Sequence, residues 1–228
     1  MSNEKSHLIT TSLIGSVKWA LEAPNSIIKP DKGGDGILTW KEKALTDLRN
    51  TLGREKTDFP EPARRGVEFE TKVYKVANLP DLNDLPGSEN FKKVCKSIRG
   101  YKFYEKKGVT IDVDGKTCYL FGKYDAISYE EKKIKDLKTT EKYSNGKYLK
   151  SFQHKMYCLI SGEGFDDFEY VVAEWDSFPK IKAIHFEQFQ VKNRELLYKE
   201  VETEIQYCFE AINDFGLWDV YREKYCLY

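Results

Sequence analysis

The sequence contains no long hydrophobic run, no excess of one charge and no compact cysteine motif. Its 228 residues are 40% hydrophobic and 32% charged, and 37 basic side chains balance 37 acidic ones. No stretch approaches the roughly 20 apolar residues that span a bilayer, and the polar first six residues predict no leader peptide. These absences argue against a membrane protein. Because the whole chain carries no net positive charge, any DNA-binding surface must be local.

The five cysteines are widely scattered and odd in number. They form neither a C-x-x-C pair nor a Cys/His cluster with the spacing of a zinc site. We therefore expect mostly buried thiols in a reducing cytosol.

The hydrophobic period changes along the chain and predicts the fold class. Helical spacing precedes residue 101, with one helix expected from Glu61–Pro62 to about Ala77. Alternation typical of strands follows, and the runs at residues 109–113 and 117–128 are expected to form a hairpin around an Asp114–Gly115 turn. A helix, two strands and a long helix end the chain. This order predicts one α/β (α+β) domain in which helices flank a central mixed sheet with an antiparallel three-stranded meander. Its expected parts are an N-terminal helical part, a catalytic core, and a C-terminal helix and tail, at residues 1–60, 61–190 and 191–228.

The stretch from residue 121 to 140, FGKYDAISYEEKKIKDLKTT, contains two short β-type runs around a charged turn. Because strand side chains alternate between faces, Asp136 and Lys138 share one face while Leu137 points into the opposite layer. If the two runs pair as a hairpin, Asp125 lies beside Asp136. Two carboxylates and an ammonium group then meet at one edge of a sheet, as in a site for a hard divalent cation.

Two flanking helices carry polar residues that could complete this site. The earlier helix offers Glu70, with Glu68 as the alternative. The later helix places Gln153 and Tyr157 four residues apart and therefore on one face, although both could instead fill space beside apolar neighbours. His154, next to Gln153, is expected to be an exposed bystander.

Such a set of residues suits the metal-dependent hydrolysis of phosphodiesters. Mg²⁺, or alternatively Mn²⁺, prefers oxygen ligands, and Mg²⁺ keeps several of its waters, so two or three carboxylates suffice. The metal polarises a phosphoryl oxygen and lowers the pKa of a bound water. A nearby lysine can position that water or stabilise developing charge, and Gln153 and Tyr157 could bind phosphate or orient Lys138.

Together, the runs GKYDAI, IKDLKTT and FQHKMY resemble the PD-(D/E)XK nuclease superfamily in its RecB-like branch. The likeness consists of a G-x-x-D strand, a D-x-K-T strand and a Q-x-x-x-Y helix. Upstream, RGVEFE at residues 65–70 resembles the R-G-x-x-x-E helix of phage lambda-type exonucleases, and LITTS at residues 8–12 resembles their I-T-x-S segment. The layout covers residues 8–215, and the specific motifs lie within residues 65–157.

This resemblance implies a restriction-endonuclease-like core that holds the metal through three carboxylates and a main-chain carbonyl, those of Glu70, Asp125, Asp136 and Leu137. It implies that Lys138 is the catalytic lysine, with Gln153 and Tyr157 as an auxiliary pair. The proline that names the superfamily is absent, since Tyr124 stands in its place, as is common in this branch. The cysteines that hold an iron–sulfur cluster in some relatives have no counterpart, so no cluster is expected.

The activity implied by the resemblance is that of a DNA exonuclease of phage or mobile-element recombination, in the cytoplasm of a bacterial or phage-infected cell. The alternatives are a repair or restriction endonuclease on this fold, a DNA-binding relative that has lost catalysis, and an unrelated sheet with a structural ion site. Lambda-type enzymes form toroidal trimers and work with a single-strand annealing protein. A homo-oligomer and such a protein are therefore the implied partners besides DNA.

Two groups of basic residues are candidates for contacts with the DNA backbone, because neutralising phosphates dominates DNA affinity. Arg64 and Arg65 stand one helical turn before the candidate glutamates and could hold a terminal phosphate. A basic helix follows, with Lys92, Lys93, Lys96 and Arg99. An ordinary solvated helix face is the alternative interpretation of that helix.

Overall fold

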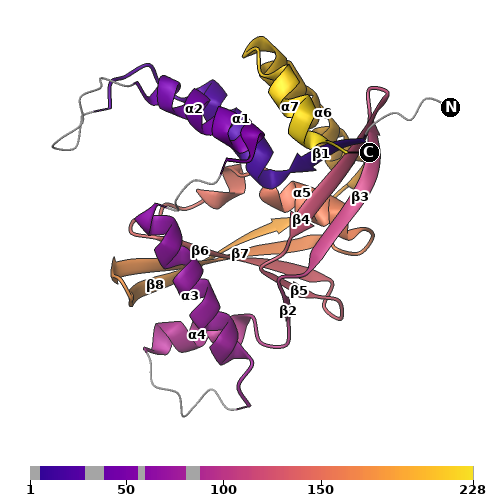
Figure 1. The fold of residues 1–228 in the computed structure, drawn as a ribbon. Helices are drawn as coiled ribbons and strands as arrows, with labels where there is room; N and C mark the ends of the chain where they lie inside the picture. Colours follow the sequence, from indigo (N-terminus) through magenta and orange to yellow (C-terminus); the bar gives the residue numbers. More distant parts are fainter. Residues whose placement is uncertain (1–5, 29–38, 56–59, 81–87, 228) are drawn as a thin grey trace. The chain divides into compact units, whose positions relative to one another are not determined.

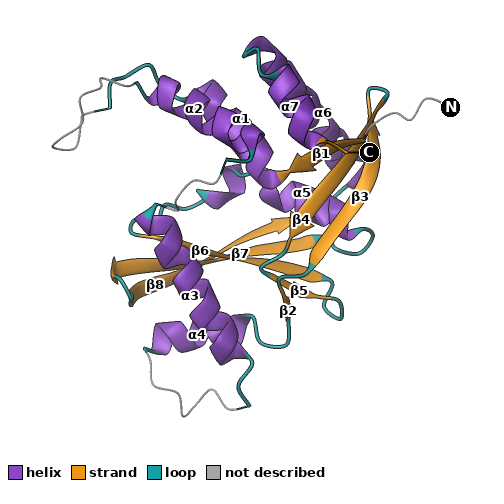
Figure 2. Cartoon of the chain, in the orientation of Figure 1, coloured by secondary structure: helices purple, strands orange, loops and turns teal. Residues whose placement is uncertain are grey.

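The computed structural model describes residues 6–28, 39–55, 60–80 and 88–227. Its structure divides into two compact units, each assembled from segments that are separate in the sequence. Unit 1 comprises residues 1–57, 108–121 and 198–228, and unit 2 comprises residues 58–107 and 122–197. The predicted fold class, α+β with mixed sheets flanked by helices, is confirmed (Figure 2). The single-domain organisation, with its parts at 1–60, 61–190 and 191–228, stays a prediction.

Unit 1 is built on a four-stranded sheet in the order β3–β4–β1–β9. In it, β1 (Ser6–Thr10) runs parallel to β4 (Lys116–Lys123) and antiparallel to β9 (Cys226–Leu227). Strand β3 (Lys106–Val113) leads into β4 through the predicted Asp114–Gly115 turn, where both residues have positive φ, as a tight hairpin requires. The helices of this unit are α1 (Thr11–Glu22), α2 (Trp40–Gly53), most of α6 (Arg194–Asp214) and α7 (Trp218–Tyr225).

Unit 2 contains a five-stranded sheet in the order β2–β5–β6–β7–β8 (Figure 1). Only β6 and β7 run parallel, and the other neighbours are antiparallel. The strands are β2 (Lys102–Phe103), β5 (Ala126–Ser128), β6 (Lys133–Thr140), β7 (Asp167–Ser177) and β8 (Lys180–Gln190).

The predicted strand at residues 117–128 is wrong in one respect, because it is two strands in two sheets. The chain leaves the ladder of β4 after Lys123 and enters β5 at Ala126. Contacts distant in sequence impose this break: Tyr124 donates its N–H to the Glu105 carbonyl at 2.8 Å, and the Tyr157 hydroxyl donates to the Lys123 carbonyl at 2.9 Å. The expected meander is therefore two separate hairpins, β3–β4 and β5–β6.

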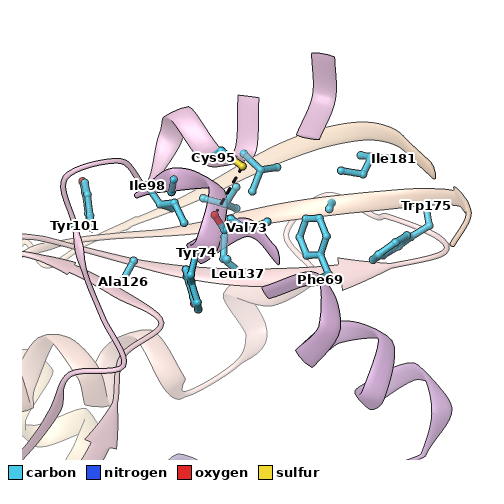
Figure 3. Packing of buried hydrophobic residues seen from close by; sticks show 14 residues of the cluster. Phe69, Val73, Tyr74, Cys95, Ile98, Tyr101, Ala126, Leu137, Trp175 and Ile181 are labelled. Carbon is cyan, nitrogen blue, oxygen red and sulfur yellow. Dashed lines mark hydrogen bonds between the residues drawn. The ribbon is translucent and has the colours of Figure 1, made fainter. Parts of the chain in front are cut away.

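One face of the unit 2 sheet carries the hydrophobic core. Helices α3 (Glu61–Ala77) and α4 (Glu89–Ser97) cover this face. Phe69 and Val73 from α3 and Cys95 from α4 pack with Leu137 of β6 (Figure 3). Leu137 thus lies in the apolar layer, as the alternation along this strand predicts.

The opposite face carries the polar residues of the central strands. Asp136, Tyr170 and Glu187 are register partners on β6, β7 and β8, so their side chains share this face. It is contacted by α5 (Gln153–Ser161), and the turn η1 (Tyr148–Lys150) is attached to it.

The described residues bear on two predictions, the absence of a membrane-spanning helix and the burial of the cysteines. No helix in the described part of the chain is long and apolar enough to cross a membrane. All five cysteines are free thiols, and Cys226 is the one that is not fully buried, so the prediction of mostly buried thiols is confirmed.

We expect Gly122→Ala to destabilise the fold. A Cβ atom on Gly122 would lie 2.8 Å from the Tyr157 ring, and overpacking of this kind costs about 1–3 kcal/mol. The matched control is Gly15→Ala in α1, where a Cβ meets nothing within 4 Å and alanine should stabilise the helix by up to about 1 kcal/mol. Urea unfolding of both variants measures the two effects, and a neutral Gly122→Ala would refute the clash.

Candidate active site

Four of the predicted residues meet at the β5–β6 hairpin. Ala126 pairs with Lys135, which brings Asp125 next to Asp136. The Leu137 N–H donates to Asp125 Oδ2 at 2.9 Å, and Lys138 Nζ lies 2.6 Å from Asp136 Oδ2. Asp136 is 1% exposed and Lys138 28%, so the ion pair has a buried anion and a cation that reaches solvent.

Gln153 and Tyr157 on α5 support this hairpin in different ways. Gln153, in the first turn of the helix, donates from Nε2 to Asp136 Oδ1 at 2.7 Å and so orients that carboxylate. Tyr157 is buried, and its hydroxyl donates to the main-chain carbonyl of Lys123, next to the bend that precedes Asp125. The structure therefore gives Tyr157 contacts that position the backbone, and its predicted catalytic role stays a prediction.

On α3, the structure brings Glu70 toward the aspartates and leaves Glu68 outside. The Tyr74 hydroxyl donates to Glu70 Oε1 at 3.0 Å, while Glu68 is exposed and paired with Lys72 at 2.6 Å. The charge of Asp136 acts on Glu70. Of the two glutamates that the sequence offered, Glu70 is the member of the carboxylate cluster.

Burial and mutual repulsion govern the protonation of the cluster. Burial is the main reason that the pKa of Asp125 lies well above its ordinary value, and the charge of Asp136 adds to it. Burial also raises the pKa of Glu70 against the opposing effect of the Tyr74 hydrogen bond. Burial alone would lower the pKa of Lys138, but the charges of Asp136 and Asp125 outweigh it and raise that pKa. Lys138 is therefore a fixed positive charge here.

The cluster matches a hard divalent cation in donor type, although its oxygens have partners within the protein. In the described ranges, no three His, Cys, Asp or Glu side chains are grouped closely enough to hold a metal ion. Asp136 Oδ2 is buried and makes an ion pair with Lys138 but no hydrogen bond of good geometry. A cation bound between the carboxylates would relieve the repulsion that raises two of their pKa values. The residues thus suit such a cation in donor type and charge but are not grouped as a closed metal site, and the ligand roles of Glu70, Asp125, Asp136 and Leu137 stay predictions.

A cleft of about 340 Å³ opens beside Lys138. The first half of α3 forms one wall, and Thr139 and Tyr148 contribute to the rest. A Cβ atom on Gly66 would lie 3.4 Å from Thr139 Oγ1. The glycine of the R-G-x-x-x-E pattern therefore keeps α3 clear of β6 at this point.

The six basic residues predicted to contact DNA lie on α3, on α4 and, for Arg99, just beyond the end of α4, and none of them lines this cleft in the part of the chain that the structure describes. Arg64 is exposed, while Arg65 pairs with Glu61. Lys92 is half-buried, and the other three are exposed: Lys93, Lys96 and Arg99. Their DNA-binding roles stay predictions.

Several residues around the cluster were not predicted from the sequence. Tyr74 binds Glu70 from one helical turn away, a spacing that could have been recognised. The positive charge of Lys123 lowers the pKa of Glu70 in part, but this lysine has no distinctive signal in the sequence. The expected exposure of His154 is wrong: it is 1% exposed, and its Nδ1 lies 3.1 Å from the Tyr170 hydroxyl.

No protein-family model matches the chain, and none of the curated proteins matches it. Among solved structures, the crystal structure of SSO0001 is 14% identical with a TM-score of 0.39, over 72% of this chain and 85% of that one. Two crystal structures of Scheffersomyces stipitis Rai1, one of them in complex with (3′-NADP)+ and a calcium ion, are 17% identical over 96% and 94% of this chain, with TM-scores of 0.36 and 0.37. The chain spans about three fifths of the Rai1 chains. These TM-scores are too low to carry an argument about function.

We expect Asp125→Asn to raise the free energy of unfolding at pH 7, since an asparagine oxygen still accepts the Leu137 N–H without the buried charge. The folded-state pKa of Asp125 is raised, so its ionised form destabilises the fold above that pKa. The advantage of the variant should therefore shrink as the pH falls toward the ordinary aspartate value. Urea unfolding between pH 4 and pH 8 measures it. A variant less stable than the wild type at pH 7 would contradict the electrostatic account.

We expect His154 to lower the free energy of unfolding in acid. Burial lowers its pKa from 6.5 to about 4, so the unfolded chain takes up the proton first and stability is lost as the pH falls below 6.5. At 1.36 kcal/mol per pH unit, the loss at pH 5 is about 2 kcal/mol. Urea unfolding at pH 7.5 and pH 5 should show a smaller loss in His154→Gln than in the wild type. Equal losses would mean that His154 titrates normally.

Proposed function

We propose that this protein is a divalent-metal-dependent DNA nuclease of the PD-(D/E)XK superfamily, in the RecB-like branch. The observation that carries the proposal is the meeting of Asp125 and Asp136 at one hairpin, with the Lys138 ammonium 2.6 Å from the second carboxylate. Glu70 and Gln153, from the helices on either side in sequence, are joined to the same cluster. Five residues in the order of the superfamily motifs thus lie near one another in unit 2.

The cofactor of this proposal is Mg²⁺, with Mn²⁺ as the alternative. The carboxylates of Glu70, Asp125 and Asp136 and the carbonyl of Leu137 would hold it. A divalent cation there supplies Lewis-acid polarisation of the phosphoryl oxygen and a water of lowered pKa.

The protein's own residues then have distinct tasks. Lys138 is protonated, so it stabilises the negative charge that develops on the phosphoryl oxygens and orients a water by donating to it. Gln153 fixes the carboxylate of Asp136, and Tyr74 does the same for Glu70. Tyr157 holds the bend before Asp125 in place through the Lys123 carbonyl.

The finer proposal is an exonuclease of phage or mobile-element recombination, which rests on the likeness of residues 65–70 to the R-G-x-x-x-E helix. A homo-oligomer and a single-strand annealing partner belong to the same proposal.

The test is the cleavage of end-labelled linear DNA and covalently closed circles with Mg²⁺, Mn²⁺ or chelator. We expect metal-dependent digestion of linear DNA, reduced at least about 100-fold in Asp136→Asn and in Lys138→Ala, because each removes a charge from the reacting centre. The matched controls are Asp176→Asn and Lys180→Ala, which break an exposed ion pair at the β7–β8 turn and should retain activity.

Three other outcomes of the cleavage assay would overturn or change the proposal. Cleavage in chelator, or full activity in both site variants, would overturn the proposal. Closed circles cut as readily as linear DNA would replace the exonuclease with an endonuclease. DNA binding without cleavage under every divalent ion would identify a relative that has lost catalysis.

A further inference from the structure

A second buried carboxylate lies two strands from the candidate catalytic aspartate, on the same face of the sheet. Glu187 on β8 is 3% exposed, and its Oε2 accepts the main-chain N–H groups of Tyr148 and Leu149 at 3.0 and 3.1 Å. A charged acceptor that binds two backbone donors is a strong anchor. Glu187 therefore fixes the turn η1 against the sheet.

The anchored turn places Tyr148 in the lining of the cleft beside Lys138. The Tyr148 ring packs on Tyr170 with a centroid separation of 5.7 Å. Lys147 Nζ lies 5.3 Å from the centre of the Tyr148 ring and 3.1 Å from Thr140 Oγ1. The cleft thus has an aromatic wall, with one cation, Lys138, in its lining and another, Lys147, at that wall.

The facing wall from α3 is largely apolar, although the buried Phe69 and the carboxylate of Glu70 also line it. Ala63 and Val67 line it, Val67 is 53% exposed, and Gly66 has no side chain. A volume of about 340 Å³ is near the lower end of small-molecule sites, which span about 300–1,000 Å³. Such a space admits one flat ring system. A base inside a duplex is stacked and paired, so a base that lies against the Tyr148 ring has to be an unpaired one.

We propose that this cleft binds one unpaired nucleotide of a single-stranded or frayed DNA end, with its base against Tyr148 and its phosphates toward Lys138 and Lys147. Glu187 is the positioning residue that holds Tyr148 in place. Base–aromatic stacking tolerates any sequence, because every base presents a π-face. The proposal rests on the proposed nuclease function and specifies its substrate class: DNA is engaged through unpaired nucleotides.

The first test measures binding in chelator, where no cleavage can occur. The probes are a fluorescent duplex with a short single-stranded end, the same duplex with abasic residues in that end, and a blunt duplex. We expect the wild type to prefer the normal end over the abasic end by about 5- to 160-fold, the range of one stacked base. Tyr148→Leu should lose this preference, and Tyr148→Phe should keep it.

The matched control is Tyr129→Leu. Tyr129, like Tyr148, has a lysine over its ring, Lys102 at 5.2 Å. It is exposed where Tyr148 is half-buried, and it follows the far end of β5 and does not line the cleft. This variant should keep the preference for the normal end. Equal wild-type affinity for normal and abasic ends would overturn the proposal, as would a loss in Tyr129→Leu equal to that in Tyr148→Leu.

The second test asks whether Glu187 positions Tyr148 or only stabilises the fold. Glu187→Leu should raise KM for the normal end about as much as Tyr148→Leu does, with kcat little changed and no effect on the abasic end. Glu187→Gln retains an acceptor for the two N–H groups and should restore KM. If Glu187→Leu does not fold, Glu187→Gln and the two Tyr148 variants, Tyr148→Leu and Tyr148→Phe, still test the proposal. A large rise in KM for Glu187→Gln on the normal and the abasic end alike would contradict a positioning role.

These results distinguish the subsite from the nuclease itself. Cleavage that ignores the bases at the end overturns the subsite and leaves the proposed activity standing. A base preference in binding without cleavage under any metal overturns the activity and leaves the subsite standing.

Discussion

Asp136 places a negative charge in the middle of a sheet, almost out of contact with water, and much of unit 2 is arranged around that charge. A buried carboxylate is costly unless it is paired and hydrogen-bonded. Lys138 supplies the countercharge from two residues along the same strand, and Gln153 supplies the hydrogen bond from α5. Lys138 and Gln153, which stabilise this charge, are also residues to which the proposed function assigns tasks, so stability and proposed function share one set of contacts.

Strand β6 carries residues of both the candidate site and the hydrophobic core, because its side chains alternate between the two faces of the sheet. Leu137 packs with α3 and α4 on one face, while Asp136 and Lys138 occupy the other. The N–H of Leu137 also binds Asp125, so the register of β6 sets the separation of the two aspartates. A slip of one residue would move the charges into the apolar layer, which makes the register strongly specified.

The parts that could be predicted from the sequence are those fixed by local pattern. The alternation of β6, the bounds of α3 and the Asp114–Gly115 turn depend on neighbouring residues and agree with the structure. The break between β4 and β5 could not be predicted, because it depends on Tyr157 and Glu105, which are distant in sequence. The burial of His154 and the anchoring of η1 by Glu187 likewise arise from packing across the sheet. For the cluster, residue types and spacing indicated Glu70 and the two aspartates, but choosing between Glu68 and Glu70 required the direction in which each helix position faces.

The central claim is that the carboxylates around Asp136 hold a divalent cation, and calorimetric titration of Mn²⁺ tests it most directly. The wild type should bind the ion, and Asp136→Asn, which keeps the size of the side chain but not its charge, should lose that binding. Absence of binding by the wild type, or equal binding by both proteins, would contradict the account.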